Sequence, residues 1–401
     1  MNRPMELDAI AAARVHFPAL ERWTYVDVAG RGVISREARA ALDAHLDERM
    51  LNGGDKAKFF ELVESTRRRF AELVHAAPDE IALTKNISEG LNMVATAFNW
   101  KRGDNLILCP ELEHPNNVYP WLNMQRYGLE VRAVAPRDGH IPIDEIVSRM
   151  DSGTRIVTVS TVSFAPGFRT DVEALGRACR ERGVLLLVDA AQSVGILDTD
   201  VNGSCIDALA VSTQKGLLGL YGMGFFYCRR EWAERMKPAY LARFGVDLGD
   251  AHEASLGDLS FKFAPAARRF DLGNYNYAAC AAVNASMQQL LAWRTAAIER
   301  HVTGLAHALA RGFLELGLRV SGGAPGPHLA NIVTVGELSA DHYGTGNERY
   351  NRLYEHLTAN RVKLSIRRGT LRFSLHVYNN LDDVARVLEL TRQFLATDGR
   401  R

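Results

Sequence analysis

Short runs of apolar residues, separated by segments with helical periodicity, recur through the first part of the chain. The run at residues 185–188 reads Leu-Leu-Leu-Val and follows a glycine, which is typical of a strand buried on both faces of a parallel sheet. Helical periodicity marks residues 36–49 and 59–74. The other strands that the pattern predicts lie at residues 81–84, 105–109, 131–135, 155–162, 208–211 and, after a glycine-rich turn, within 216–232. We therefore predict an α/β fold.

The pattern changes at about residue 281. A long helix is expected there, followed by strands at Val320 and at residues 332–335 and by a closing helix at 381–395. The predicted parts of the chain are a leading helix and connector at 1–24, a large domain at 25–280 and a small C-terminal domain at 281–401.

Composition indicates an ordinary globular chain. With 401 residues, 47% of them hydrophobic and 24% charged, the chain can bury a large core. Its 48 basic and 47 acidic side chains nearly cancel, which gives no sign of a nucleic-acid or anionic-membrane surface. The N-terminus lacks a signal-peptide core, and no stretch approaches the roughly 18 apolar residues of a membrane span. We therefore expect a cytoplasmic protein that binds neither nucleic acid nor membranes.

The cysteines and histidines show no metal-binding spacing. CxxC, paired Cys/His and HExxH patterns are all missing from the sequence, so neither a metal site nor a disulfide framework is predicted. The cysteines, which we expect to be reduced and mostly buried, are Cys109, Cys179, Cys205, Cys228 and Cys280.

Asp189 and Lys215 are the first candidates for chemistry. Asp189 ends the apolar strand, and ligands of open α/β sheets bind outside the carboxyl ends of strands. Lys215 follows a second short strand and a run of hydroxyl and amide side chains. Such a pair fits a pyridoxal phosphate site, with Lys215 holding the aldehyde as a Schiff base and Asp189 keeping the ring nitrogen protonated. A helix-capping aspartate and a surface lysine would be the structural alternative.

The whole segment resembles the cysteine desulfurase and class V aminotransferase group of fold-type I pyridoxal-phosphate enzymes. In that group the strand ends D-x-A-Q, and the lysine follows a Ser/Thr-x-His/Gln pattern. The matching residues here are Asp189, Ala191, Gln192, Ser212, Gln214 and Lys215. The likeness spans roughly residues 25–395. It implies a large domain with a seven-stranded, mostly parallel sheet, a smaller α+β C-terminal domain, and Gln192, Ser212 and Gln214 as cofactor-binding residues.

A second segment matches the group's phosphate-binding motif, T-[ST]-E-[AG]-[IL]-N. Ser88 and Glu89 open an apolar-periodic helix here, and Ile87 replaces the first hydroxyl residue. A helix N-terminus presents free N–H groups and partial positive charge, which suit a phosphate. The resemblance therefore implies Ser88 and Glu89 as cofactor-binding residues, whereas an ordinary serine N-cap is the alternative.

The resemblance also implies the contacts to the cofactor ring. The segment from Glu113 to Trp121 matches the pattern E-H-x-x-N-x-x-P-W, which implies that His114 stacks on the ring and relays protons. In desulfurases an asparagine donates to the ring hydroxyl, and Thr161 stands in its place here. Thr161, or else Ser163, is expected to take over that contact.

A fourth segment implies a homodimer. The stretch at residues 268–279 resembles the group's R-[FY]-E-x-G-[TS]-x-[NP] segment, which reaches the phosphate of the neighbouring subunit. Gly273 and Asn274 occupy the positions of the glycine and the hydroxyl residue. Active sites at a dimer interface are therefore implied.

The chain lacks the catalytic cysteine of the desulfurases. The loop that carries this cysteine in the group is cut short, and the last cysteine of the chain, Cys280, lies far upstream. Arg372 matches the arginine that grips the substrate α-carboxylate, a task that suits a bidentate guanidinium.

Arg31 is a candidate for a second anion contact. It lies between Gly30 and Gly32 in the segment expected to enter the active site. Together, Arg31 and Arg372 would favour a substrate with a second acidic group, although a surface arginine in a flexible turn is an equal alternative.

These residues imply an enzyme that acts on an α-amino acid, or on an intermediate derived from one, through an external aldimine. Aminotransferase-type chemistry is the first expectation, with C–S β-elimination or epimerisation as alternatives, because all three begin with removal of the Cα proton by Lys215. A pyridoxal-phosphate-binding scaffold without turnover is the alternative of a different class. That scaffold would have no need of Arg372.

Overall fold

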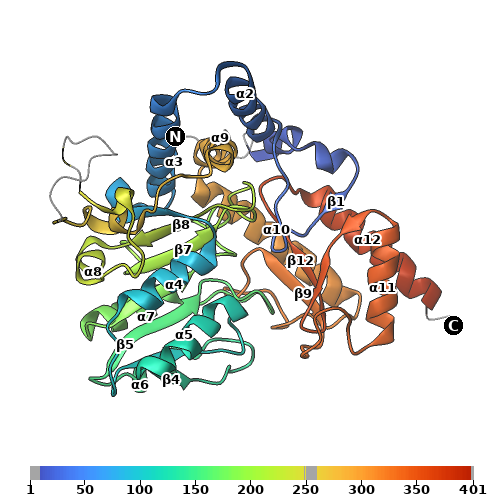
Figure 1. Ribbon diagram of the computed structural model, residues 1–401. Coiled ribbons are helices and arrows are strands. Elements are labelled where there is room, and N and C mark those ends of the chain that lie inside the picture. Colours follow the sequence, from blue (N-terminus) through green and yellow to red (C-terminus); the bar gives the residue numbers. More distant parts are fainter. Residues whose placement is uncertain (1–9, 248, 250–259, 399–401) are drawn as a thin grey trace.

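Seven strands form the main sheet of the computed structural model, which describes residues 10–247, 249 and 260–398 (Figure 1). Their order is β2-β8-β7-β6-β5-β3-β4. The bounds are β2 (Ile81–Thr84), β3 (Asn105–Leu108), β4 (Glu130–Ala133), β5 (Thr154–Ser160), β6 (Leu185–Asp189), β7 (Ala208–Ser212) and β8 (Gly224–Cys228). Only β8 runs antiparallel to its neighbours within this described sheet. The predicted seven-stranded, mostly parallel sheet is confirmed.

The strand predicted at 105–109 ends one residue early, at Leu108, and two other predicted strands end two residues early. The strand expected at 155–162 ends at Ser160, because Val162 turns away to form a bridge with Arg169. The strand expected at 131–135 ends at Ala133. Both strands therefore end where the chain turns at the carboxyl edge of the sheet.

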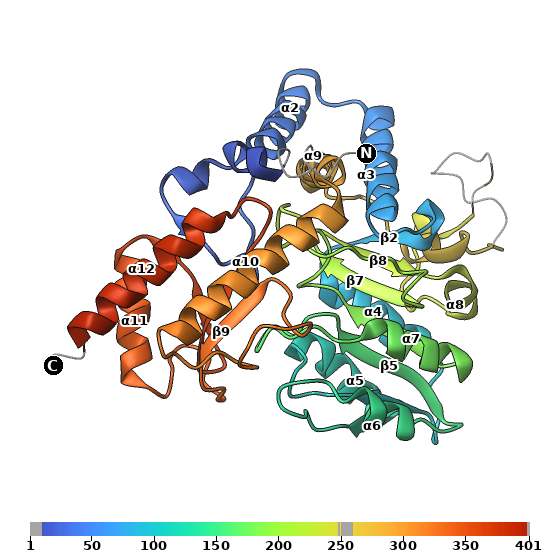
Figure 2. The same cartoon turned by 180° about the vertical axis from the view of Figure 1, so that it is seen from behind.

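Helices cover both faces of the sheet, as two opposite views show (Figure 2). Leu186 and Val188 of β6 belong to the apolar cluster under one set of helices, whereas Leu185 and Leu187 belong to the cluster under the other. Burial of each such side chain contributes roughly 1.5–3 kcal/mol. The first set is α3 (Lys56–Leu73), α7 (Val172–Glu181) and α9 (Tyr277–Trp293), and the second is α4 (Ile87–Ala97), α5 (Tyr119–Met124) and α8 (Arg230–Arg235).

A three-stranded antiparallel sheet organises the C-terminal part of the chain, in the order β11-β12-β9. Its strands are β9 (Ile332–Gly336), β11 (Ser365–Arg367) and β12 (Thr370–Ser374), and the helices packed with them are α10 (Thr295–Glu315), α11 (Glu348–Ala359) and α12 (Leu381–Asp398). The helix expected from residue 281 is two helices, because Arg294 adopts a φ of 66° between α9 and α10. Val320 forms an isolated bridge with Val335 rather than a strand.

The N-terminal segment packs on residues near the C-terminus. β1 (Thr24–Tyr25) pairs in parallel with β10 (Val362–Lys363). Arg14 donates to Asp383 over 2.7 Å, and the Phe17 ring lies 5.0 Å from that of Tyr378. The division at 24 and 280 stays a prediction; residue 280 lies inside α9, which packs on α2 (Arg36–Asn52) and α3. Residues 1–9 of the expected leading helix lie outside the described residues.

The remaining elements are short. They are α6 (Ile143–Ser148) and the 3-10 helices η1 (Arg14–His16), η2 (Pro18–Glu21), η3 (Pro78–Glu80), η4 (Pro115–Asn117), η5 (Gln125–Tyr127), η6 (Arg243–Gly245) and η7 (Ala266–Phe270). In the described ranges, we find no helix whose length and apolar character would let it cross a bilayer.

A buried ion pair joins α3 to the sheet edge and to the segment after η7. Arg67 and Asp271 are 0% and 1% exposed, and Nη2 of Arg67 donates to Oδ2 of Asp271 over 2.7 Å. Arg67 also donates to the Ile81 carbonyl, and Asp271 accepts from the Leu83 N–H over 3.0 Å. Each charge thus has its partner inside the protein.

Loss of one member of this pair should destabilise the fold strongly. Asp271→Ala leaves the Arg67 charge buried without its carboxylate, so we expect a loss of about 3–5 kcal/mol in the free energy of unfolding. The measurement is urea unfolding at fixed protein concentration. Asp144→Ala is the control, because Asp144 pairs with Arg137 at the surface. A loss no larger than that of the control would contradict the prediction.

Candidate active site

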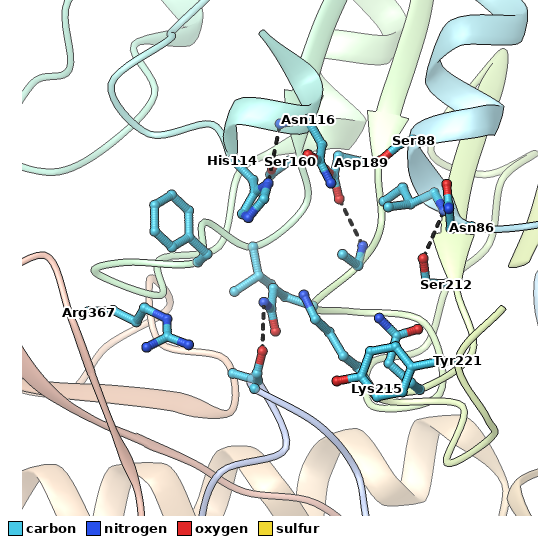
Figure 3. Close-up of a pocket in the computed structure, with 18 of the residues that line it drawn as sticks. Asn86, Ser88, His114, Asn116, Ser160, Asp189, Ser212, Lys215, Tyr221 and Arg367 are labelled. Atoms are coloured by element: carbon cyan, nitrogen blue, oxygen red, sulfur yellow. Dashed lines mark hydrogen bonds between the residues drawn. The ribbon is translucent and has the colours of Figure 1, made fainter. Parts of the chain in front are cut away.

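A cavity of about 390 Å³ opens at the carboxyl ends of β5, β6 and β7 (Figure 3). The first turn of α4, the hairpin of β11 and β12, and the segment after β1 complete its walls. Eight of the predicted site residues line it: Ser88, His114, Asp189, Gln192, Ser212, Gln214, Lys215 and Arg372. The other lining residues are Ala29, Gly30, Asn86, Ile87, Asn116, Ser160, Val162, Phe164, Ala191, Tyr221 and Arg367.

Asp189 and Lys215 face this cavity from neighbouring strand ends. Asp189 is the last residue of β6, is 4% exposed, and accepts from the Ala191 N–H over 3.0 Å. Its burial raises the pKa of the carboxyl group, which the Ala191 N–H and the Lys215 charge oppose. Lys215 follows β7 by three residues.

The environment of Lys215 favours a neutral amine. Loss of water around Nζ lowers its pKa to about 8; the Asp189 charge opposes this shift, and the charges of Arg372 and Arg367 add to it. Gly32 lets the segment after β1 press against this lysine, because a Cβ there would lie 2.5 Å from the Lys215 carbonyl oxygen. The backbone of Lys215 is therefore closely packed, and its amine is more readily deprotonated than that of an ordinary lysine, as suits a nucleophile or a base.

His114 lines the cavity from an exposed position. Its Nδ1 accepts from the Asn116 N–H over 3.2 Å, and its ring meets that of Phe164 edge to face at 5.6 Å. Loss of water around the ring lowers the pKa of His114 to about 4, and the Lys215 charge adds to this shift. The imidazole is therefore neutral at neutral pH and can lie against a cationic or aromatic ring.

Glu113 anchors the His114 loop to β5. Its two carboxyl oxygens accept from the N–H and the hydroxyl of Ser160, over 2.7 and 2.6 Å, and one also accepts from the Asn117 amide over 2.8 Å. Burial, followed by the nearby Asp189 charge, raises the pKa of Glu113 to about 7. This carboxyl group fixes the loop without lining the cavity.

The first turn of α4 provides an anion-binding end. Asn86, not Ser88, is the N-cap: its side chain accepts from the Glu89 N–H over 3.0 Å. The Ile87 N–H donates to the Ser212 hydroxyl over 2.8 Å, and Ser88 follows as the second residue of the helix. Helix N–H groups and two serine hydroxyls thus meet at one end of the cavity, which suits a phosphate.

Gly90 lets this helix lie close to the sheet. A Cβ at Gly90 would lie 2.9 Å from the Cβ of Ala210 in β7, which is too close for two carbon atoms. The small pair Gly90 and Ala210 therefore sets the distance between the anion-binding turn and the strand that leads to Lys215.

Arg372 is held rigidly on β12. It is 2% exposed, its Nε donates to the Ser365 hydroxyl over 3.1 Å, and its Nη1 donates to the Phe164 carbonyl over 3.0 Å. Nη2 lies 3.8 Å from Oδ1 of Asp27, beyond hydrogen-bond distance. Burial lowers the pKa of Arg372 to about 10, so the guanidinium stays charged at neutral pH. A carboxylate ligand can therefore bind the remaining N–H donors of the guanidinium.

The residues of the cavity fit pyridoxal phosphate. Figure 3 shows Ser88 and Ser212 on one side, Asp189 and His114 above, and Lys215 reaching in from below. Hydroxyls at a helix N-terminus suit the phosphate, the Asp189 carboxylate suits a protonated ring nitrogen, and the Lys215 amine suits the aldehyde. Gln192 adds a side-chain oxygen that has no hydrogen-bond partner within the described parts of the chain.

Five predicted site residues do not line this cavity. The Glu89 carboxylate folds back onto the Lys85 N–H and, with Gly273 and Asn274, lines a neighbouring cavity of about 430 Å³. Thr161 donates its hydroxyl to Ser193 over 2.6 Å and lines a third cavity. Arg31 is exposed, although Ala29 and Gly30 of the same segment do reach the site, as expected.

The contact of Thr161 with the cofactor stays a prediction, although its hydroxyl already has a partner within the protein. Its N–H is bonded to the Asp189 carbonyl over 3.1 Å, which sets the direction of its side chain. The Ser163 hydroxyl accepts from the N–H groups of Gly167 and Phe168, and Ser163 does not line the cavity. Ser160, which pairs with Asp189 across β5 and β6, lines the cavity instead.

The residues that sequence reasoning missed depend on pairing between strands. Ser160 is the last residue of β5, and alignment of the ends of β5 and β6 would have placed it beside Asp189. Arg367 would have followed from the Arg-Gly turn, which sets it on the same hairpin as Arg372. Asn116, Phe164 and Tyr221 come from loops and had no such signal.

Comparison with known proteins gives consistent matches. A family model described as "Aminotransferase class-V" matches residues 52–387. A probable cysteine desulfurase of Methanothermobacter thermautotrophicus is 31% identical over 294 residues, which cover 72% of this chain and 72% of the relative. The uncharacterized aminotransferase YcbU of Bacillus subtilis is 25% identical over 376 residues, covering 93% and 95% of the two chains.

Solved structures share the fold. A cysteine desulfurase from Thermococcus onnurineus NA1 has a TM-score of 0.83 at 23% identity, over 96% of this chain and 98% of that one. A mutant of the protein C-DES, with glycine covalently linked to its PLP cofactor, also has a TM-score of 0.83, at 22% identity over 94% of this chain and 98% of that one.

The lowered pKa of Lys215 predicts selective labelling. In the protein freed of cofactor, an amine-acylating reagent should modify Lys215 with a midpoint near pH 8, because the neutral fraction of the amine rises through that pH. Mass spectrometry of the Lys215 peptide across a pH series gives the midpoint. In Asp189→Asn the midpoint should fall, since the carboxylate that raises the pKa is gone. A midpoint that rises in this variant would refute the assigned pairing.

Proposed function

The chain belongs to the class-V aminotransferase family of pyridoxal-phosphate enzymes, and we propose that it acts on an α-amino acid by aminotransferase-type chemistry. The family expected from the motifs is thereby confirmed, and the cofactor is pyridoxal 5′-phosphate. The observation that carries the proposal is that Lys215, Asp189 and Arg372 meet in one cavity. A binding scaffold would need no carboxylate clamp beside its lysine.

The residues divide the work between the two ends of the cavity. Ser88, Ser212 and the first turn of α4 bind the phosphate, and His114 stacks on the ring. Asp189 holds the proton at the ring nitrogen. When bound, the cofactor supplies an electron sink for the bond broken at the substrate Cα.

The remaining residues act on the substrate. Arg372 binds the α-carboxylate and so orients the Cα–H bond. Lys215, once its amine is free, removes that proton from Cα and returns it to a different atom. The pKa of about 8 suits this role, because the amine is easily deprotonated near neutral pH and still carries a proton as a weak acid.

Persulfide chemistry of the desulfurase type is disfavoured by the β11–β12 connection. Two residues, Arg368 and Gly369, join these strands with φ of 48° and 75°. That is the tight turn of a hairpin, too short to carry a cysteine to the substrate. Cys109, Cys179, Cys228 and Cys280 are buried, Cys205 is partly buried, and none of the five lines the cavity. The family's transferase and lyase reactions remain compatible with these residues.

We propose a homodimer in which Gly273 and Asn274 contact the phosphate of the partner. Both have positive φ, at 80° and 47°, and both line the neighbouring cavity rather than the one that holds Lys215 of their own chain. Leu272, beside them, is 39% exposed. We further propose a cytoplasmic location, which the unpaired state of the five cysteines supports.

The proposed dimer predicts the mass in solution. Light scattering coupled to gel filtration should give twice the chain mass of 44.4 kDa. Asn274→Arg should weaken the dimer or its cofactor affinity, since a bulky side chain enters the proposed contact. A monomer that binds the cofactor with full affinity would contradict the proposal.

The proposed reaction predicts both a label and a product. Borohydride treatment of the cofactor-loaded protein should fix the cofactor to Lys215, and Lys215→Ala should lose both this label and turnover. With a panel of amino acids, the wild type should release a 2-oxo acid with the whole carbon skeleton. The measurements are peptide mapping and mass spectrometry of the products. A label on another lysine would refute the site.

The product separates the alternative reactions. Elimination would release ammonia and a 2-oxo acid that has lost its side-chain substituent. Epimerisation would return the mirror-image amino acid. Either result would replace aminotransferase-type chemistry while leaving the assignment of Lys215 intact.

A further inference from the structure

We infer that Arg367 forms a second anion subsite beside Arg372, so that the substrate of the proposed function is an α-amino acid with a distal carboxylate. The inference rests on the proposed function for its amino acid and on the geometry of the hairpin for its second charge. The second anion contact is thus assigned to Arg367, which lines the cavity, and no longer to Arg31, which is exposed and lies outside the cavity.

Strand register places both arginines on one face of the hairpin. Arg372 is paired with Ser365, and Arg367 is paired with Thr370 in the same antiparallel ladder. Arg367 lies two residues from Ser365, and side chains at that spacing project to the same face. Arg367 and Arg372 are therefore diagonal neighbours, and such neighbours lie about 7–8 Å apart at the backbone. A short dicarboxylic molecule can span that interval.

Arg367 reaches the cavity at the end remote from the phosphate-binding turn. Figure 3 shows its guanidinium on the side opposite Ser88 and Ser212, below His114. Val162 and Phe164 give the same cavity an apolar part of its wall. A ligand could thus place its methylene groups on this wall and a carboxylate on each guanidinium.

The charge of Arg367 has no acidic partner within the described residues. Its one hydrogen bond there runs from Nη1 to the Ile366 carbonyl, over 2.7 Å, and leaves the other donors open. The guanidinium is only half-buried, yet its field depresses the pKa of Lys215, His114 and Arg372 alike, which places it close to all three. A carboxylate ligand would supply the partner that the protein does not.

The neighbouring arginine offers a matched comparison. Arg368 is half-buried like Arg367, but it donates to the Glu111 carbonyl and does not line the cavity. Two adjacent arginines of equal charge therefore differ in the one feature that the inference uses. Substitution of each separates a local contact from a general loss of positive charge.

The test measures binding without turnover. Calorimetric titration of the cofactor-loaded enzyme would compare succinate, glutarate and adipate with monocarboxylates of the same chain length. Because these probes lack an amine, they report the two carboxylate contacts whichever reaction the enzyme performs. We expect at least one dicarboxylate to bind about tenfold to a hundredfold more tightly than its monocarboxylate counterpart, the usual gain from a charge-assisted contact.

The variants identify the residue responsible. Arg367→Gln should abolish the dicarboxylate preference and leave monocarboxylate affinity unchanged, whereas Arg368→Gln should keep the preference. Arg367→Lys, which retains the charge but not the planar fork, should keep part of it. Thermal melts of the variants check that each is folded.

Three outcomes would overturn the inference. The wild type could show no preference for any dicarboxylate, or Arg368→Gln could lose the preference as fully as Arg367→Gln. Arg367→Gln could also weaken both probe types equally, in which case Arg367 and Arg372 clamp one carboxylate together. Failure of the proposed function is separate: a preference that depends on Arg367, without a 2-oxo acid from any amino acid, would retain the subsite and reject the reaction.

Discussion

The electrostatic coupling between Asp189 and Lys215 is the interaction on which the site depends. Parallel strands bring both residues to one edge of the sheet, where the protein removes water from a carboxylate and an amine together. Burial alone would make both groups neutral, and their mutual attraction opposes that change. The charges of Arg372 and Arg367 further lower the pKa of Lys215. The result is a lysine that is easily deprotonated beside an acid that can hold a proton on a ligand.

A second acid, Glu113, connects this electrostatic centre to the scaffold. It accepts three hydrogen bonds, from Ser160 and Asn117, and thereby ties the His114 loop to the strand beside Asp189. Burial raises the pKa of Glu113 to about 7, and the nearby Asp189 charge adds to this shift. The pKa of Glu113, which fixes the loop, thus also depends on the charge of Asp189. The hydrogen bonds that Glu113 accepts from Ser160 fix the His114 loop relative to β5.

The sequence was sufficient to predict features that a contiguous stretch of residues determines. Apolar runs located the strands of the main sheet, and the motifs located Asp189, Lys215, His114 and Arg372, since each motif is contiguous in the chain. Contacts between distant segments had no such signal: Arg14 meets Asp383 across almost the whole chain, and Arg294 ends a helix through its backbone conformation. Thr161 and Ser160 are adjacent in sequence, so only the end of β5 and the pairing with β6 decide which one faces the cavity.

The tight turn between β11 and β12 bears on two proposals: it disfavours persulfide chemistry, and it positions Arg367 for the inferred substrate specificity. A long loop at this position would carry its residues away from the hairpin, and in the desulfurases it carries the cysteine. Here Arg368 and Gly369 close the hairpin directly, so β11 continues up to Arg367 and holds that side chain in register with β12. In this chain the tight turn therefore keeps the Arg367 cation at the edge of the cavity. On this family's scaffold, the length of one turn can decide whether the substrate's side chain meets a nucleophile or an anion-binding group.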